Sequence, residues 1–244
     1  MPVGDFQGQT AVVTGASSGI GRAIAVGLAQ QGATVCLVGR DASSLEAIAR
    51  NYPALASGVV CYKADLEDDK DLLELKARLR WNLGHVDVLV HSAGAICLGR
   101  IESARIEDLD QQYRINVRAP YVLTQALLPM LKLRKGQIVF INSSVSLRNA
   151  EANLGQYSAT KHALKAIADS LRSEVNAEGL RVLSVYPGRT ASRMQEAVRG
   201  LEGKEYSPER LMQPEDVAAV VLHALCLPRT VEVTDISLRP LAKC

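Results

Sequence analysis

The sequence predicts a doubly wound α/β fold of the Rossmann type, with a parallel sheet of about seven strands and helices on both of its faces. Short apolar segments rich in β-branched residues alternate along the chain with longer amphipathic stretches. The apolar segments are hydrophobic almost throughout, which is typical of parallel strands covered on both faces. The length of 244 residues suits one large domain, because α/β domains often reach about 250 residues as a unit.

The predicted elements alternate as strand and helix, which implies right-handed β-α-β crossovers. The strand-like segments are, in chain order, AVVTG, ATVCLVG, GVVCYKA, VDVLVHS, GQIVFINSS and LRVLSVYPG, followed by a short strand over Asp235–Arg239. The helical stretches lie at about Gly19–Gln31, Ala42–Asn51, Asp68–Leu83, Ile106–Leu133, Leu154–Glu178 and Glu215–Leu225. Gly179 is a typical helix terminator, and Pro214 followed by Glu215 is a typical helix start.

We expect residues 1–244 to form a single domain, because no internal repeat, low-complexity tract or linker divides the sequence. The least regular segment is Arg189–Gln213, which contains Gly200, Gly203 and Pro208. It follows the carboxyl end of a predicted strand, the edge where ligands bind in open α/β sheets. We therefore interpret residues 189–213 as a mobile substrate lid; the alternative is an ordinary surface excursion.

Composition and charge argue against several kinds of partner. The formal net charge is only +2, so no polyanionic partner such as a nucleic acid is indicated. No apolar run approaches the roughly 20 residues of a membrane span, and the N-terminus lacks the basic and apolar regions of a secretory signal. The five cysteines contain no C-x-x-C pair and share no ligand spacing with the four histidines, so we expect a reduced, cytoplasmic protein without a metal site.

The most informative candidate site is the pair Tyr157 and Lys161 in GQYSATKHALKAIADSL. Spacing of i to i+4 places the ammonium beside the phenol on one helix face. The positive charge favours the phenolate and lowers the pKa of the phenol from its ordinary value of about 10. A tyrosine tuned in this way can exchange a proton with an alcohol or carbonyl oxygen near neutral pH. Taken alone, however, this spacing more often marks a surface Tyr and Lys on an amphipathic helix.

A second candidate site is the turn TGASSGIG, which follows the first strand and opens the first helix. Gly15, Gly19 and Gly21 have the spacing G-x-x-x-G-x-G, which differs from the G-x-G-x-x-G of the common dinucleotide fingerprint. The physical basis is shared, because glycine permits a tight turn close to a phosphate and the helix N-terminus attracts negative charge. The position at the first strand–helix junction favours a phosphate site over a purely structural turn.

These motifs follow one another in the order of a known family. The TGxxxGxG turn is followed by HSAG (His91–Gly94), Asn116, Ser144, Tyr157 and Lys161, and Ser144 precedes Tyr157 by 13 positions. Over nearly its whole length the chain resembles the short-chain dehydrogenases/reductases of the common single-domain branch. The resemblance implies an enzyme that uses NAD or NADP and transfers a hydride between the nicotinamide and an alcohol or carbonyl carbon.

The resemblance assigns catalytic roles to Asn116, Ser144, Tyr157 and Lys161. Tyr157 gives its proton to the carbonyl oxygen, Ser144 hydrogen-bonds the same oxygen, and Lys161 lowers the tyrosine pKa and holds the nicotinamide ribose. Asn116 matches an asparagine that holds a water between Lys161 and solvent; alternatively, it satisfies a local backbone group within its helix. Ser143 is the rival of Ser144, and we prefer Ser144 because adjacent strand residues face opposite sides and the 13-residue spacing selects it.

The resemblance also implies a dinucleotide site along the carboxyl ends of the strands. The predicted cofactor-binding residues are Gly15, Ser17, Ser18, Gly19, Ile20, Gly21, Arg40, Asp65, Leu66, Ser92, Ala93, Gly94, Tyr157, Lys161, Pro187, Gly188 and Ser192. Thr190 competes with Ser192 for the role of the hydroxyl beyond the sixth strand. Asp65, after the third strand, is alternatively a helix cap.

The end of the second strand favours NADP(H) over NAD(H). Where NAD is preferred, an acidic residue at this position binds the ribose hydroxyls. Here Gly39 is followed by Arg40, whose guanidinium can hold a 2′-phosphate, and Ser17 can add a hydrogen bond. Asp41, one residue beyond, is expected to cap the next helix. The alternative for Arg40 is a solvated loop charge.

Two segments depart from the family pattern. His91 and Ser92 replace an asparagine pair, so the side-chain bonds that stabilise the sheet there must be made differently. The C-terminal VEVTDISLRPLAKC lacks the glycine-rich end of many members, which leaves the substrate pocket and the subunit contact without a prediction. Arg189 and Arg193 are candidates for binding an anionic substrate, with solvated surface arginines as the alternative.

The sequence therefore favours an NADP-dependent carbonyl reductase or alcohol dehydrogenase that acts on a small-molecule carbonyl or alcohol. The alternatives are an NAD-linked alcohol dehydrogenase on the same scaffold and a non-catalytic, dinucleotide-sensing regulator, although sensor relatives usually lose the tyrosine or the lysine. Relatives commonly pair through two long helices. By that analogy we expect a homodimer or homotetramer that associates through about Ile106–Leu133 and Leu154–Glu178.

Overall fold

The apolar, β-branched segments form seven parallel strands in the computed structural model, which describes residues 5–52, 58–148 and 151–241. The strands are β1 (Thr10–Thr14), β2 (Thr34–Gly39), β3 (Val59–Lys63), β4 (Val88–His91), β5 (Gln137–Ile141), β6 (Arg181–Pro187) and β7 (Asp235–Leu238). Their order in the sheet is β3-β2-β1-β4-β5-β6-β7, which confirms the predicted doubly wound fold. The order reverses between β1 and β4, and this reversal opens a crevice for ligands at the carboxyl ends of the strands.

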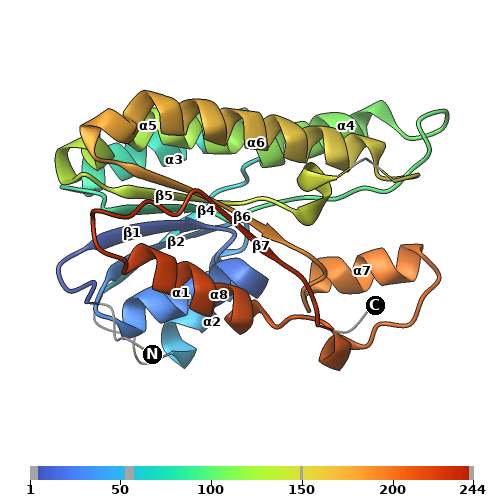
Figure 1. The fold of residues 1–244 in the computed structure, drawn as a ribbon, viewed down its shortest axis with the longest axis horizontal. Coiled ribbons are helices and arrows are strands. Elements are labelled where there is room, and N and C mark those ends of the chain that lie inside the picture. The colour runs from blue at the N-terminus through green and yellow to red at the C-terminus, as the bar shows by residue number, and fades with distance from the viewer. Residues whose placement is uncertain (1–4, 53–57, 149–150, 242–244) are drawn as a thin grey trace.

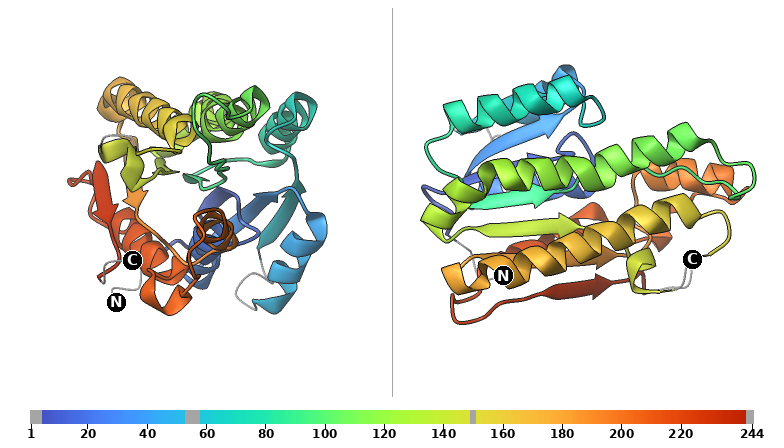
Figure 2. Two further views of the ribbon diagram at one scale, coloured as in Figure 1. Left: turned by 90° about the vertical axis from the view of Figure 1, so that its right-hand side faces the viewer. Right: turned by 90° about the horizontal axis from the view of Figure 1, so that it is seen from above.

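Helices cover both faces of the sheet, as Figures 1 and 2 show. One layer holds α1 (Gly19–Gln30), α2 (Ala42–Asn51) and α8 (Pro214–Leu225), and the other holds α3 (Asp69–Asn82), α4 (Ile106–Tyr113), α5 (Ala119–Arg134) and α6 (Gly155–Val175). Alternate strand residues fill the two cores. Ala11 and Val13 of β1 belong to the core under the first layer, and Val12 belongs to the core under the second. This two-sided burial explains why the strands are apolar at every position.

The stretch predicted as one helix from Ile106 to Leu133 is interrupted. A π-helical turn, Arg114–Arg118, separates α4 from α5. Asn116 lies in this turn and is fully buried, and its amide bonds to the backbone of Ala95 instead of to its own helix. Single π-turns inside helices are frequent at functional sites, and this one aims an asparagine at the end of β4.

The segment Arg189–Gln213 is more regular than predicted. It contains α7 (Arg193–Leu201) and a short 3-10 helix, Pro208–Arg210. Ser192 caps α7, because its hydroxyl accepts a hydrogen bond from the Gln195 N–H at 3.2 Å. A parallel bridge between Thr190 and Met212 closes the base of the segment. The prediction that this segment is irregular is wrong, because a capped amphipathic helix occupies its first half; its action as a lid stays a prediction.

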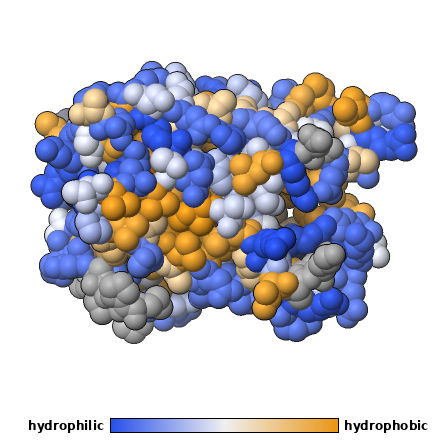
Figure 3. All heavy atoms as spheres, viewed as in Figure 1, coloured by the Kyte–Doolittle hydropathy of each residue, from blue (hydrophilic) through white to orange (hydrophobic). Residues whose placement is uncertain are grey.

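The C-terminal segment completes one edge of the sheet. β7 pairs with β6, and the Leu238 carbonyl accepts a hydrogen bond from the Gly188 N–H at 2.8 Å. The tail therefore packs against the turn that follows β6, beside the carboxyl edge of the sheet. Over this side of the molecule, Figure 3 shows a band of hydrophobic residues in front of α8 and β7. Half-buried Leu222 and Ile236 belong to these two elements.

Two negative findings apply to the described ranges. Within them, no helix combines the length and the hydrophobicity that crossing a bilayer requires. The same residues contain no group of three or more His, Cys, Asp or Glu side chains that are placed to hold a metal ion.

Candidate active site

A cavity of about 570 Å³ runs along the carboxyl ends of the strands. Every residue that the sequence predicts to bind the dinucleotide lines this cavity, from the glycine turn at one end to Tyr157 and Lys161 at the other. Ser143 and Ser144 line it as well, whereas Asn116 lies behind its wall. A cavity of this size falls in the range of small-molecule and cofactor sites, about 300–1,000 Å³.

The three glycines of the turn have different structural roles. Gly15 has a φ of +67°, and a Cβ placed on it would lie 2.7 Å from the backbone nitrogen of Ala93. A Cβ on Gly21 would lie 2.5 Å from the Gly15 carbonyl oxygen, so Gly15 and Gly21 allow β1, α1 and the end of β4 to meet. Gly19 has a φ of +54°, and a Cβ there would approach only Ser192, at 3.7 Å. The turn is therefore packed on its inner side and open towards the cavity.

The N-terminus of α1 fits a phosphate group. Ser18 is the N-cap residue, yet its side chain makes no capping hydrogen bond to the helix. The first N–H groups of a helix have no partner within the helix, and a bound anion satisfies them while gaining from the helix dipole. Together with the open face of Gly19, this arrangement matches what a dinucleotide pyrophosphate requires.

Thr14 is a site residue that the sequence analysis did not assign. Its Oγ1 accepts hydrogen bonds from the Ser92 and Ala93 N–H groups, both at 3.2 Å, and donates to the Val90 carbonyl oxygen at 3.4 Å. These bonds fix the backbone after β4 against the end of β1, where it lines the cavity. The available signal was its place as the first residue of the TGxxxGxG motif.

The end of β2 presents a cation to the cavity. Arg40 is exposed, and among the described residues no acidic side chain pairs with it. Asp41 caps α2 as predicted, because its carboxylate accepts from the Ser43 and Ser44 N–H groups, and these bonds, with those of the two serine hydroxyls, lower its pKa. Asp65 accepts from the Glu67 N–H at 3.1 Å, and Asp68 is the residue that caps α3. The helix-cap alternative for Asp65 is therefore wrong.

Tyr157 and Lys161 lie one turn apart on α6, and both are buried, with exposed fractions of 8% and 4%. The Lys161 Nζ lies 5.8 Å from the centre of the Tyr157 ring and donates a hydrogen bond to the Ile141 carbonyl oxygen at 3.2 Å. Burial disfavours the charged form of each group. It lowers the pKa of Lys161 to about 8 and raises the pKa of Tyr157, and a hydrogen bond with Ser143 offsets part of that rise.

This geometry differs from the prediction that the ammonium lowers the tyrosine pKa. Desolvation of the phenol has the larger effect, and the ammonium is bonded to the Ile141 carbonyl rather than to the phenol oxygen. The pKa of Tyr157 lies above its ordinary value of about 10, so the side chain holds its proton at neutral pH.

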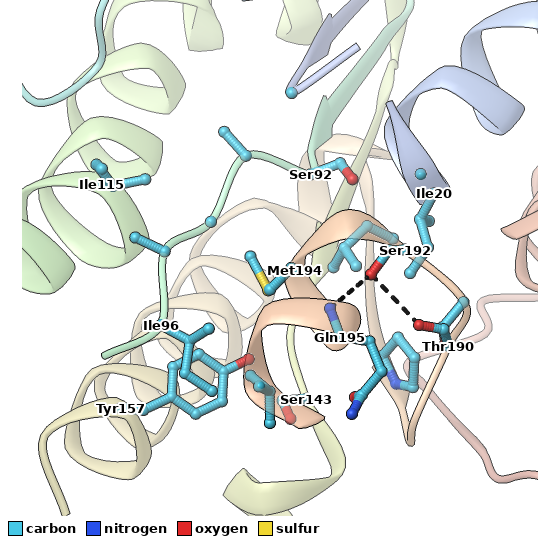
Figure 4. A pocket seen from close by; sticks show the side chains of 18 of the residues that line it. Ile20, Ser92, Ile96, Ile115, Ser143, Tyr157, Thr190, Ser192, Met194 and Gln195 are labelled. Carbon is cyan, nitrogen blue, oxygen red and sulfur yellow. Dashed lines mark hydrogen bonds between the residues drawn. The ribbon is translucent and has the colours of Figure 1, made fainter. Parts of the chain in front are cut away.

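Ser143 lies near Tyr157 on the cavity wall (Figure 4), and its side-chain hydrogen bond offsets part of the rise in the tyrosine pKa. β5 ends at Ile141, so the alternation of strand side chains does not extend to Ser143 and Ser144. Ser143 is extended and caps the 3-10 helix Ser144–Leu147, with its Oγ accepting from the Val145 N–H at 3.3 Å. Ser144 lines the same cavity, and its choice as the catalytic serine stays a prediction.

Asn116 holds the backbone that surrounds the site. Its Oδ1 accepts from the Ala95 N–H at 2.8 Å, and its Nδ2 donates to the Ala95 carbonyl at 2.9 Å and to the Thr160 Oγ1 at 3.0 Å. These bonds join the segment after β4 to α6, next to Lys161. Asn116 thus satisfies backbone groups of another segment rather than of its own helix. Thr160, one residue before Lys161, is a further supporting residue that the sequence analysis did not single out.

His91 replaces the missing asparagine contacts with a link to α5. Its Nε2 shares a 2.8 Å hydrogen bond with the Thr124 hydroxyl, and its ring stacks on Phe140 with centroids 5.0 Å apart. Complete burial lowers the pKa of His91 to about 3, so the imidazole is neutral. The residue is a structural substitute at the end of β4 rather than a proton carrier.

The segment around α7 closes the remaining side of the cavity. The Ser192 hydroxyl donates to the Thr190 carbonyl at 3.3 Å, in addition to capping α7 (Figure 4). Thr190 donates to the Gly188 carbonyl at 3.2 Å. Arg189 makes a bidentate ion pair with Glu202, with distances of 3.0 and 2.8 Å, and Glu202 also pairs with Arg199 and Lys204. Arg193 is exposed at the rim of the cavity.

Known proteins share this fold and this set of motifs. The family model described as short chain dehydrogenase matches residues 9–202. The chain belongs to the short-chain dehydrogenase/reductase family. An uncharacterized oxidoreductase of Staphylococcus epidermidis is 36% identical over 236 residues, which covers 95% of this chain and 97% of that protein. The predicted family membership is thereby confirmed.

Solved structures of the family are similar over almost the entire chain. An alcohol dehydrogenase from Thermococcus sibiricus complexed with 5-hydroxy-NADP is 28% identical, with a TM-score of 0.86 and coverage of 97% of this chain and 98% of that one. A short-chain dehydrogenase from Burkholderia cenocepacia in complex with NADP is 29% identical, with a TM-score of 0.82 and coverage of 96% and 97%.

Gly15→Ala should weaken both folding and dinucleotide binding. The new Cβ combines a positive φ with contacts below 3.0 Å to the backbone of Ala93, so the turn must move. We expect a loss of about 1–3 kcal/mol of stability by urea unfolding and at least a tenfold loss of NADPH affinity by fluorescence titration. Gly8→Ala is the matched control, because Gly8 has a φ of +72° with nothing within 4 Å. Equal losses of NADPH affinity in the two variants would contradict this assignment.

Ser144→Ala should impair catalysis more than Ser143→Ala. Removing one hydrogen-bond donor from a reacting oxygen typically costs about 10²–10³ in rate, and we expect an effect near the lower end for kcat/KM of carbonyl reduction with the Ser144 variant. Ser143→Ala should have the smaller effect, because it alters a hydrogen bond beside the phenol. Steady-state kinetics at saturating NADPH measures both. The opposite ranking would give the catalytic role to Ser143.

Proposed function

We propose that this protein is an NADP(H)-dependent oxidoreductase that interconverts a carbonyl compound and an alcohol, with Tyr157 as the general acid and base. The observation that carries the proposal is the buried pair Tyr157 and Lys161, which lines one cavity together with Ser143, Ser144 and an open glycine turn. The pair is equipped to move a proton at a substrate oxygen, and the turn is equipped to bind a phosphate.

The residues of the cavity fit a dinucleotide in the proposed orientation. The α1 N-terminus with Ser18 and Gly19 would hold the pyrophosphate, and Arg40 with Ser17 would hold the 2′-phosphate of NADP. When bound, the nicotinamide supplies or accepts the hydride at the reacting carbon. Support for NADP comes from the neighbours of known structure that contain it and from the absence of an acidic residue at Gly39.

The chain's own groups would handle the proton. Tyr157 is protonated at neutral pH and would donate to the carbonyl oxygen, while Ser144 would hydrogen-bond the same oxygen as negative charge develops on it. The nearby Lys161 ammonium would then stabilise the resulting phenolate, because a charge in a water-poor site interacts over several ångströms. Oxidation of the alcohol would run through the same proton transfer in reverse.

A homo-oligomer is part of the proposal. Four large side chains lie exposed along α4 and α5, namely Ile106, Tyr113, Tyr121 and Leu133, with exposed fractions of 61%, 50%, 53% and 87%. Exposed apolar side chains along one pair of helices suit association with a second copy. The family analogy that suggests a homodimer or homotetramer points to the same helices.

Tyr157→Phe should abolish turnover without loss of cofactor binding. The phenyl ring keeps the packing and loses only the ionisable oxygen, and general acid catalysis contributes about 10²–10⁴ in rate. We expect kcat for NADPH-dependent reduction across a carbonyl panel to fall by at least about 100-fold, with NADPH affinity within about twofold of wild type. Tyr113→Phe, at an exposed position, is the control. Undiminished turnover would contradict the role, and a wild-type protein that binds NADPH but turns over nothing would favour the sensor alternative.

Arg40→Ala should selectively weaken NADPH. A charged hydrogen bond to a phosphate contributes about 1.5–3 kcal/mol, so we expect NADPH to bind about 10–100-fold more weakly and NADH to bind about equally well. Arg50→Ala, which alters an exposed arginine of α2 paired with Glu46, is the matched control. Fluorescence titration with each dinucleotide measures the change. Tighter binding of NADH by the wild type would favour the NAD-linked alternative.

A further inference from the structure

The first turn of α7 lies over the catalytic groups. A Cβ built on Gly94 would be 3.9 Å from the Lys161 Nζ and 3.9 Å from the Met194 Cε. The ends of the Lys161 and Met194 side chains therefore both lie close to Gly94. Ser192, at the other end of this turn, is the nearest neighbour of Gly19. The side chains that α7 directs inwards can therefore contact a ligand that occupies the cavity between the glycine turn and Tyr157.

Gln195 has an unsatisfied carboxamide in this turn. Its backbone N–H donates a hydrogen bond to the Ser192 hydroxyl at 3.2 Å, so its backbone is anchored at the start of α7. The Nε2 is buried, and among the described residues it has no hydrogen-bond partner. Figure 4 shows the side chain pointing to the side of the cavity where Ser143 lies, across from Tyr157.

An unpaired buried amide is costly, and the structure offers a way to satisfy it. The terminal torsion of glutamine is soft, so a small rotation brings either the amide nitrogen or the amide oxygen to the cavity. Leaving a buried donor unsatisfied is unfavourable, and an oxygen atom of a ligand in the cavity would remove that penalty. Two other long polar side chains of the cavity wall are already engaged, because Gln111 bonds to Glu67 and Arg148 pairs with Glu151, whereas Arg40 and Arg193 are exposed.

Part of the cavity wall is apolar and consists of Ile96, Val145, Leu154, Met194 and Val198. A carbon skeleton fits against such side chains, whereas a second polar group on it needs a specific partner. On this part of the wall the unsatisfied carboxamide of Gln195 is available to be that partner.

We infer that Gln195 is a specificity-determining residue that hydrogen-bonds a second oxygen atom of the substrate, so that the preferred substrates are hydroxyketones and related compounds with an oxygen near the reacting carbonyl. The inference rests on the proposed carbonyl reduction. A site built to hydrogen-bond a substrate hydroxyl discriminates against the analogue that lacks it, because the buried polar group is then left unpaired. Gln195 does not take part in proton transfer.

The test compares matched ketones that differ only by a hydroxyl in place of a methyl group. Suitable pairs are hydroxyacetone with 2-butanone and 2-hydroxyacetophenone with propiophenone. In the wild type, kcat/KM with saturating NADPH should favour the hydroxyketone of at least one pair. In Gln195→Leu that preference should fall by about tenfold or more, because the hydroxyketone loses its partner while the plain ketone does not. The test compares this within-pair ratio of kcat/KM between the variant and the wild type. The intrinsic difference in reactivity of the two ketones is the same in both proteins and therefore cancels.

Glu196→Leu is the matched control, because Glu196 is exposed on the same turn of α7 and does not line the cavity. It should leave the ratio unchanged. NADPH affinity, measured by fluorescence, should be unaltered in Gln195→Leu; a loss there would assign the carboxamide to the cofactor and overturn the inference. An unchanged ratio would overturn it too, as would a wild type that reduces other carbonyl compounds but neither hydroxyketone. A wild type without any NADPH-dependent turnover would instead refute the proposed function itself.

Discussion

The burial of the Lys161 ammonium beside Tyr157 is the constraint on which the rest of the site depends. A charge this deep needs a partner, and the Ile141 carbonyl at the end of β5 supplies one. That bond ties α6 to the carboxyl edge of the sheet. The same burial lowers the pKa of Lys161 and raises that of Tyr157, so it sets both the geometry and the protonation state of the candidate catalytic pair.

The surrounding backbone is held by polar side chains at the end of β4. Thr14 binds the N–H groups of Ser92 and Ala93, and Asn116 binds both backbone groups of Ala95. Gly15 lets these two segments touch. The cavity wall between the glycine turn and Lys161 is thereby rigid on one side. On the other side α7 closes it, and there the unpaired carboxamide of Gln195 remains to interact with a ligand.

Much of this was predictable from the sequence, because it depends on local patterns. Continuous apolar segments predicted the strands, glycine spacing predicted the turn, and Asp41 was recognisable as a cap. What the sequence did not reveal depends on tertiary packing. The strand alternation used to compare Ser143 with Ser144 does not apply because β5 ends at Ile141, and the rise in the Tyr157 pKa follows from burial that no local pattern records.

The most direct test of the account is the pH dependence of kcat/KM for carbonyl reduction at saturating NADPH. Reduction needs protonated Tyr157 and charged Lys161, so activity should be present below their pKa values and lost as the pH rises through them. Because the Tyr157 pKa is raised and that of Lys161 is about 8, the account predicts a level profile from about pH 6 to 7.5 and a decline that begins near pH 8. A reduction rate that rises steadily with pH across this range would contradict it.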